Sequence, residues 1–116
     1  MNEIISHTGI FVRNPYGNYV VQYVIELNDM AVNAAIGEQL LGSLLELGRQ
    51  KYSSNVLEKC LEMNVRRVQD AMVEEMLTAP SYLDFLLDQY GNYVIQKTLA
   101  VANKDHLALL LQVRRL

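Results

Sequence analysis

The sequence is poor in the residues on which many small extracellular or metal-dependent folds rely. It holds no tryptophan, two prolines and a single cysteine, Cys60, in 116 residues. One cysteine can form neither an internal disulfide nor a cysteine cage for zinc, which excludes a disulfide-stapled secreted scaffold and a zinc finger. Apolar runs such as residues 107–111 fall far short of the roughly 18 residues that span a bilayer. The first residues also lack the basic start and apolar centre of a signal peptide, so we expect an intracellular, soluble chain without a membrane partner.

The charge of the chain is slightly negative and evenly mixed. Lysine and arginine together number 10 and aspartate and glutamate 13, which gives a formal net charge of -3 at pH 7. An acidic balance argues, at first, against a nucleic-acid partner. The chain is 51% hydrophobic and 20% charged. It is therefore too apolar for intrinsic disorder and has enough apolar residues for the core of a small domain.

Three short segments of the sequence align with one another without gaps. The copies are residues 16–22, 52–58 and 90–96. Their third positions, Asn18, Ser54 and Asn92, are separated by 36 and then by 38 residues. A period near 36 residues predicts a solenoid in which each unit packs on its neighbours. We expect the two additional residues to lie around 78–80, at the mid-chain proline.

Apolar residues recur at helical spacing after each segment, which predicts a helix that is buried along one face. The stripes are Val20, Val21, Val24 and Ile25, then Val56, Leu57, Cys60 and Leu61, then Val94, Ile95, Leu99 and Val101 with Ala102. Further amphipathic stretches cover 30–48, 65–77, 81–88 and 104–115. Because no strand-like alternation occurs, we predict an all-α fold.

The starts of these helices carry small or capping residues. Gly17, Ser53 and Gly91 lie where the three repeated helices begin. Aspartates at or near further helix starts can accept hydrogen bonds from free backbone N–H groups; these are Asp29, Asp70 and Asp105.

Outside the repeated polar positions the sequence offers little chemistry. It shows no phosphate-cradling glycine loop, nucleophile elbow or metal-ligand spacing, so we expect no enzyme, metal or cofactor. His7 and His106 are too far apart in sequence to suggest a pair. The residues that we expect to pack in the core are Cys60, Met63, Met72, Met76, Tyr16, Tyr52 and Tyr90. Glu74 and Glu75 are interpreted as part of a solvated face.

Each repeated helix carries a triplet of polar positions. The triplets are Asn18, Tyr19 and Gln22, then Ser54, Asn55 and Glu58, then Asn92, Tyr93 and Gln96. The first and third residues of a triplet are four apart and share a helix face, whereas the second is rotated by about 100° toward the neighbouring unit. A pair of hydrogen-bonding groups beside a flat side chain suits an unstacked base, held by its edge and covered on its face.

These motifs resemble repeats six, seven and eight of a Pumilio (PUF) RNA-binding domain. The flanking residues 53–60 and 88–97 are similar to the family consensus, and the resemblance covers nearly the whole chain. It implies a right-handed α-solenoid that forms part of a longer Pumilio homology domain. We expect an incomplete first repeat at 1–28, repeats at 29–65 and 66–102, and the start of another at 103–116.

The resemblance also implies a code of one base per repeat, with the RNA antiparallel to the protein. Asn92 and Gln96 would bind a first uracil, Ser54 and Glu58 a guanine, and Asn18 and Gln22 a second uracil. The residues that stack on bases would be Tyr19, Asn55 and Tyr93. The expected element is 5′-UGU-3′.

Basic residues near the triplets are candidate phosphate contacts. They are Arg13, Lys51, Lys59 and Lys97, with Arg49 nearby. The acidic residues counted against RNA fall mainly on the intervening helices, so we expect a locally basic concave face and modest salt dependence. Those acidic residues are Glu38, Glu46, Asp70, Glu74, Glu75 and Asp105.

The family resemblance further implies post-transcriptional control of messenger RNA through 3′ untranslated regions in the cytoplasm, with deadenylase or translational-repressor proteins as partners. Two alternatives stay open. One is a HEAT- or armadillo-like protein-interaction module that does not bind RNA. The other is a nucleolar PUF relative that acts in ribosome maturation.

Overall fold

The computed structural model describes residues 2–103, 105, 107 and 108. Over these residues the chain forms helices and short connections without strands, which confirms the all-α prediction. The helices are α1 (Asn2–Ser6), α2 (Thr8–Arg13), α3 (Gly17–Glu26), α4 (Met30–Leu40), α5 (Leu44–Leu47), α6 (Lys51–Leu61), α7 (Arg66–Leu77), α8 (Tyr82–Leu87) and α9 (Gly91–Val101). Most of the helix predicted at 104–115 lies outside the described residues.

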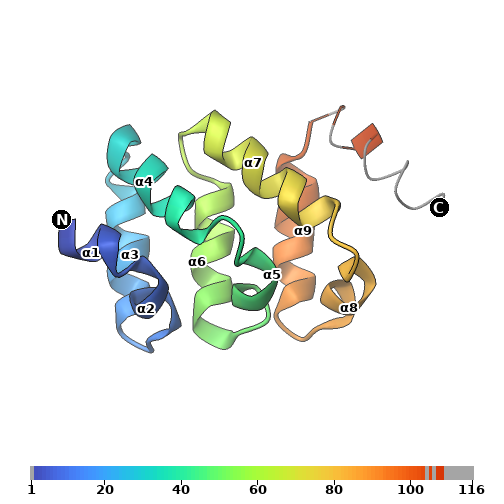
Figure 1. Ribbon diagram of the computed structural model, residues 1–116, viewed down its shortest axis with the longest axis horizontal. Coiled ribbons are helices and arrows are strands. Elements are labelled where there is room, and N and C mark those ends of the chain that lie inside the picture. Colours follow the sequence, from blue (N-terminus) through green and yellow to red (C-terminus); the bar gives the residue numbers. More distant parts are fainter. Residues whose placement is uncertain (1, 104, 106, 109–116) are drawn as a thin grey trace.

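The helices form three successive units of three. Figure 1 shows the third helices of the units, α3, α6 and α9, side by side in one row, and these are called the row helices below. Each row helix packs on the next, and the first helices α1, α4 and α7 make their own contacts from unit to unit. The first unit is the shortest, because α1 has 5 residues where α4 and α7 have 11 and 12.

The predicted apolar stripe is buried except at the two ends of the row. Val56 and Val94 are fully buried, whereas the equivalent Val20 is 46% exposed. At the other end, Leu61 is buried and the equivalent Leu99 is 37% exposed. The stripe prediction was therefore wrong for Val20 and Leu99. Both exposures are explained if the valine position packs on the preceding row helix and the leucine position on the following one. The described row has no helix before α3 to cover Val20 and none after α9 to cover Leu99.

The start of each row helix lies very close to the helix before it. A Cβ atom added to Gly17 would lie 2.7 Å from the Phe11 carbonyl oxygen, and one added to Gly91 would lie 2.5 Å from that of Phe85. In the middle unit Ser53 takes the glycine position and donates a hydrogen bond to the Leu47 carbonyl oxygen. The prediction that a small residue begins the helix is confirmed for α3 and α9 and was wrong for α6, which begins at Lys51. Close packing on the preceding helix is the reason for a small residue in all three units.

The stretch predicted as one amphipathic segment at 30–48 is two helices. The break follows Leu40, and Gly42 takes a left-handed backbone conformation with a φ of 92°. The connection between α7 and α8, 78–81, is one residue longer than the connection 41–43 between α4 and α5. Helix α7 is also one residue longer than α4. The two additional residues of the third unit therefore lie where the sequence placed them.

The carboxylates of Asp29 and Glu75 cap helix starts, and only the first of these caps follows the sequence prediction. The Asp29 side chain accepts a hydrogen bond from the Val32 N–H at 3.1 Å, which confirms it as the cap of α4. Asp70 lies inside α7 and forms an ion pair with Arg66, so its predicted place at a helix start was wrong.

Glu75 is a cap that the sequence interpretation missed. Its carboxylate oxygens accept hydrogen bonds from the N–H groups of Gly42 at 2.6 Å and Leu44 at 3.1 Å, across the interface between units. Its interpretation as a merely solvated residue was wrong, because the turn before α5 turns its free N–H groups toward α7.

The core predictions hold for sulfur-containing residues and fail for one tyrosine. The side chains of Cys60, Met63, Met72 and Met76 are buried, and burial raises the pKa of the Cys60 thiol to about 12. Tyr16, in contrast, is 81% exposed rather than packed. Tyr52 and Tyr90 are partly buried.

Candidate nucleic-acid interface

Each polar triplet lies on one of the row helices, which stand side by side, so the row brings the triplets to neighbouring places (Figure 1). Side chains just before the outer row helices fix this geometry. The Asn14 side chain accepts hydrogen bonds from the N–H groups of Tyr16 and Gly17. Asp88 accepts the equivalent bonds from Tyr90 and Gly91. These contacts fix where the outer row helices begin.

Asp88 also links two units, because its carboxylate pairs with Arg49 at 3.5 Å. Partial burial works to raise the pKa of Asp88. The hydrogen bonds from Gly91 and Tyr90 and the guanidinium of Arg49 outweigh burial, so the net effect lowers that pKa. Asp88 is therefore held as a carboxylate.

In the first row helix the asparagine and glutamine of the triplet form one hydrogen-bonded unit. The Asn18 amide nitrogen donates to the carbonyl oxygens of Asn14 at 2.8 Å and Pro15 at 3.0 Å. Its oxygen accepts a hydrogen bond from the Gln22 amide at 3.1 Å. Asn18 is fully buried and Gln22 is half-buried. The sequence interpretation assigned both side chains to the edge of one base, whereas the Asn18 amide holds the helix start and orients Gln22.

The last row helix repeats this arrangement. The Asn92 amide nitrogen donates to the carbonyl oxygens of Asp88 at 2.8 Å and Gln89 at 3.1 Å. The Gln96 amide in turn donates to the Asn92 oxygen at 3.2 Å. Both outer row helices thus present a glutamine whose orientation is fixed by the asparagine one turn earlier.

The middle row helix is different. The Ser54 hydroxyl is 3% exposed and donates to the Lys51 carbonyl oxygen at 3.1 Å. Within the described part of the chain, the Glu58 carboxylate has no hydrogen bond or ion pair. Burial raises the pKa of Glu58, Lys97 lowers it, and Glu62 raises it again, with a net rise above the ordinary value. The middle helix therefore presents an unpaired, partly desolvated acceptor.

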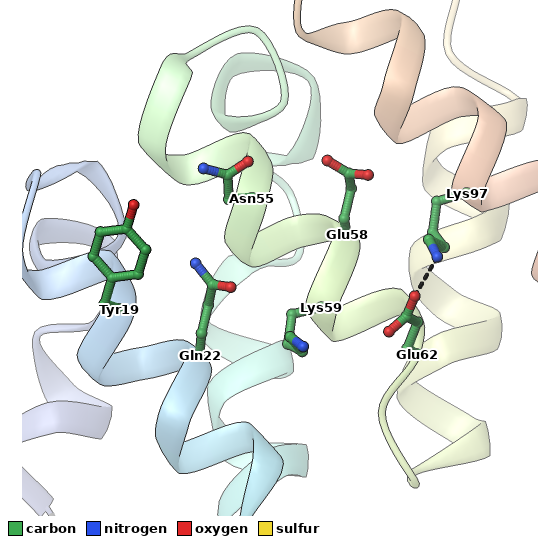
Figure 2. Close-up of a pocket in the computed structure, with 7 residues that line it drawn as sticks. All are labelled: Tyr19, Gln22, Asn55, Glu58, Lys59, Glu62 and Lys97. Carbon is green, nitrogen blue, oxygen red and sulfur yellow. Dashed lines mark hydrogen bonds and ion pairs between the residues drawn. The ribbon is translucent and has the colours of Figure 1, made fainter.

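The three side chains predicted to stack on bases are exposed. Tyr19 and Tyr93 are 62% and 57% exposed, and Asn55 is also exposed. Figure 2 shows Tyr19 and Asn55 on neighbouring row helices, with Gln22 and Glu58 beside them. These side chains line an open groove of about 320 Å³, together with Lys59, Glu62 and Lys97. The groove therefore combines base-edge and stacking candidates from adjacent units.

Most of the predicted phosphate contacts are already paired with carboxylates. Lys59 binds Glu26 at 2.8 Å, and Lys97 binds Glu62, each across the interface between two row helices. Arg13 pairs with Glu46 at 3.3 Å. Lys51 instead lies over the ring of the adjacent tyrosine, with its ammonium nitrogen 5.6 Å from the ring centre. The groove is therefore balanced in charge rather than basic as predicted.

The sequence interpretation overlooked Glu26 and Glu62, the acidic partners in these pairs. They are 36 positions apart, at the repeat period, and their lysine partners are 38 positions apart. Periodic acids opposite periodic lysines were thus a readable signal. The hydrogen bond from Lys59 to Glu26 stabilises the charged ammonium and so raises the pKa of Lys59.

The described residues offer neither a metal-binding cluster nor a membrane-spanning helix. No cluster of histidine, cysteine, aspartate or glutamate there has the geometry to hold a metal ion. No helix in the same residues is long and apolar enough to cross a membrane.

Comparison with known proteins accounts for this arrangement. The family model of the Pumilio-family RNA binding repeat matches residues 11–40, 43–77 and 81–113. These repeats begin at a different point from those predicted at 29–65 and 66–102, and that division stays a prediction.

Two curated relatives come from Arabidopsis thaliana. Putative pumilio homolog 8, chloroplastic, is 39% identical over 99% of this chain and 22% of its own length. Pumilio homolog 12 is 39% identical over 100% of this chain and 20% of its own length. The chain therefore spans about a fifth of the length of these relatives.

Solved structures agree with the sequence relatives. PUF-8 in complex with PBE-RNA superposes with a TM-score of 0.84 at 32% identity, over 98% of this chain and 35% of that one. The Puf3 RNA-binding domain bound to a Cox17 RNA 3′ UTR site superposes with a TM-score of 0.81 at 25% identity, over 98% of this chain and 38% of that one. The repeat period, the row of polar triplets and these matches have one explanation: the chain belongs to the Pumilio family of RNA-binding repeats, which are not enzymes.

Proposed function

We propose that this chain binds single-stranded RNA at a 5′-UGU-3′ element through the groove side of the row helices. The observation that carries the proposal is the order of groups along the row. A fixed glutamine on α3 and another on α9 flank the unpaired carboxylate of Glu58 on α6. The row thus offers amide, carboxylate, amide to three successive bases.

The chemistry of each position suits one base. A glutamine amide carries both a donor and an acceptor, as the edge of uracil requires. Glu58 when ionised has only acceptors, which match the adjacent N1–H and N2–H donors of guanine. Charge-assisted hydrogen bonds of this kind are about twice as strong as neutral ones. Glu58 therefore favours guanine, while Gln22 and Gln96 favour uracil.

The exposed flat side chains supply the stacking surfaces. Tyr19 lies between the positions of the second uracil and of any base beyond it, and Tyr93 lies between the first uracil and the guanine. Asn55 covers the junction between the guanine and the second uracil with a smaller plane. Stacking on an aromatic side chain contributes about 1–3 kcal/mol per base.

The paired lysines favour recognition of bases over attraction of phosphates. A phosphate contact contributes to salt dependence in proportion to the charges neutralised. Because Lys59 and Lys97 already bind carboxylates, we expect a shallow dependence of affinity on salt. Lys51, which pairs with an aromatic ring rather than an acid, is the best remaining phosphate contact.

At the level of the whole protein, we propose post-transcriptional control through 3′ untranslated regions, with deadenylase or repressor proteins as partners. The Puf3 complex with a 3′ UTR site supports this role by homology. The cytoplasmic location stays a prediction, since two relatives carry a chloroplastic label in their names. The nucleolar alternative predicts weak base discrimination, so affinity for UGU separates it from the main proposal.

The test is fluorescence anisotropy with labelled RNA that contains UGU, against a control in which UGU is replaced by ACA. We expect tighter binding to UGU, with a preference that persists at higher salt. Three bases give limited affinity, so the same titration is run with a longer parent protein that carries the preceding repeats. Equal affinity for the two RNAs in both proteins contradicts the proposal.

A further inference from the structure

Of the base-edge side chains Gln22, Glu58 and Gln96, only Glu58 changes its hydrogen-bonding groups when it gains a proton. Gln22 and Gln96 keep their donors and acceptors at every accessible pH, because an amide does not titrate. Glu58 accepts from two guanine donors only when it is ionised, and a protonated carboxyl brings a donor toward a donor. Recognition of guanine therefore depends on the charge of this one residue.

The charged groups around Glu58 come from three helices. On its own helix, Glu62 lies one turn further along and Lys59 is the next residue. From α9, Lys97 lines the same groove, and from α3, Tyr19 does so. Glu26, also on α3, forms an ion pair with Lys59. Figure 2 shows the Lys97 ammonium bound to Glu62 on the side of the groove where Glu58 lies.

These groups act on Glu58 in opposite directions. Like charges one turn apart on a helix repel, so Glu62 disfavours a second carboxylate at Glu58. The Lys97 ammonium counters this repulsion, because it neutralises Glu62 and is close enough to lower the pKa of Glu58. Burial, the largest influence, works against ionisation. Lys97 is thus the cation that opposes both burial and Glu62.

The preceding unit has the same ion pair without the titrating residue. There the equivalents of Glu58, Glu62 and Lys97 are Gln22, Glu26 and Lys59, and Lys59 binds Glu26 at 2.8 Å. A neutral amide gains nothing from a nearby cation. The chain therefore contains its own control for a purely structural role of such a pair.

We propose that Lys97, which belongs to the uracil-binding repeat, is a positioning residue for guanine recognition by the neighbouring repeat, because its ammonium offsets the Glu62 charge beside Glu58 and so keeps the Glu58 carboxylate ionised. The proposal rests on the proposed function. It makes guanine specificity a property of the interface between two repeats rather than of one triplet.

The experiment compares Lys97→Met and Glu62→Gln with the unchanged chain. The affinities for UGU and UUU RNA are measured by anisotropy between about pH 3.5 and 8, a range that extends below the ordinary pKa of a glutamate. The ratio of the two affinities cancels any phosphate contact that the RNAs share. In Lys97→Met the pH at which guanine preference is half lost should rise by about 0.5–1 unit. At a pH within the titration of Glu58, this shift lowers the ratio of UGU to UUU affinity by about 3- to 10-fold. In Glu62→Gln the midpoint should fall, because a repelling charge is removed and Lys97 is released.

The opposite signs separate the proposal from a structural role. Both variants break the same ion pair, so a role in stability alone would move both ratios in the same direction, and that outcome overturns the proposal. Lys59→Met, which breaks the equivalent pair beside Gln22, should leave the midpoint unchanged. In a Glu58→Gln background, Lys97→Met should have no effect on the ratio.

A second readout does not depend on RNA. The titration of the Glu58 carboxyl is followed by NMR in the free protein and its two variants. Shifts of opposite sign support the proposal even where affinity is weak, whereas absent or parallel shifts overturn it. If the carboxyl titrates as expected and the unchanged chain shows no preference for UGU over UUU, the proposed function fails rather than the electrostatic coupling.

Discussion

The outer row helices and the middle row helix hold their base-edge side chains in place in different ways. In α3 and α9 the first triplet residue is an asparagine whose amide is fixed to the helix start and whose oxygen holds the glutamine. In α6 the equivalent Ser54 bonds only to its own turn and leaves Glu58 without a hydrogen-bonding partner among the described residues. The outer positions are preorganised by neighbours on the same helix. The middle position depends instead on charges brought by an adjacent repeat.

The helix starts differ in the same way. The outer row helices start with a glycine against a backbone carbonyl, whereas α6 has Ser53 hydrogen-bonded to the equivalent carbonyl. Before the outer helices lie Asn14 and Asp88, which cap them with side-chain oxygens. Gln50 precedes α6, and its side chain makes no capping hydrogen bond. The three row helices thus lie side by side although two different sets of local contacts hold their starts.

The largest expected effect comes from converting the middle triplet into an outer one. The combined change Ser54→Asn, Asn55→Tyr and Glu58→Gln should transfer preference from UGU to UUU. Loss of one matched base edge and gain of another are each worth about 1–3 kcal/mol. Anisotropy with both RNAs measures the change, and thermal unfolding checks that the variant is folded. A folded triple variant that still prefers UGU would mean that the residue assignment is wrong.

The next effect concerns stacking. Tyr93→Ala should weaken binding of UGU RNA by about 1–3 kcal/mol, because an exposed aromatic plane is lost. Asn55→Ala, at the equivalent place on α6, should cost clearly less, since the smaller plane stacks weakly. Titration calorimetry of the two variants against one RNA gives the difference. Equal losses would show that the plane of the side chain does not decide the energy.

A smaller effect on stability should separate the helix starts. Gly91→Ala places a Cβ atom 2.5 Å from a backbone carbonyl oxygen that no side-chain rotation can move. Overpacking of this kind costs about 1–3 kcal/mol. Ser53→Ala at the equivalent position removes one hydrogen bond and should cost about 1 kcal/mol. Urea unfolding measures both, and a larger loss for Ser53→Ala would contradict the packing argument.

The smallest effect is expected from Asp88→Asn, which gives the third unit the capping residue that the first unit has at Asn14. The cap should survive, and only the pairing with Arg49 is lost, at a cost below about 1 kcal/mol. The pKa of Asp88 is lower in the folded chain than its ordinary value of 3.8. Its stabilising contribution is therefore present at neutral pH and disappears as the pH falls below about that value. Urea unfolding of both proteins at pH 7 and pH 3 should show the difference shrink; a constant difference would assign it to the cap.

In the unchanged chain, Glu58 affects stability in the opposite direction to Asp88. Because its pKa is raised on folding, ionised Glu58 opposes folding at neutral pH and this cost disappears as the pH falls. Glu58 is thus kept at a position where it destabilises the free protein, as expected for a residue retained for binding. The outer helices bear no such cost, since Gln22 and Gln96 are neutral.

Much of this molecule could be predicted from residues alone. The period, the helical class, the small residues at the helix starts and the buried sulfur-containing residues all follow from spacing and side-chain size, which act within a few turns. Errors arose where a residue depends on a distant partner. Glu75 is the clear case, because the N–H groups that it caps belong to another unit.

The sequence by itself determined the helical repeat and the chemistry of each triplet, because both are set by residue identity at 3.6-residue and 36-residue spacing. Only the tertiary structure decided how those groups are used. Lys97 and Glu62 are 35 positions apart, and spacing alone does not say that their charges meet beside Glu58. Nor does composition show that the lysines near the row are neutralised. Electrostatic contacts depend on distance in space, so the packing of one repeat on the next sets the charge state of the groove.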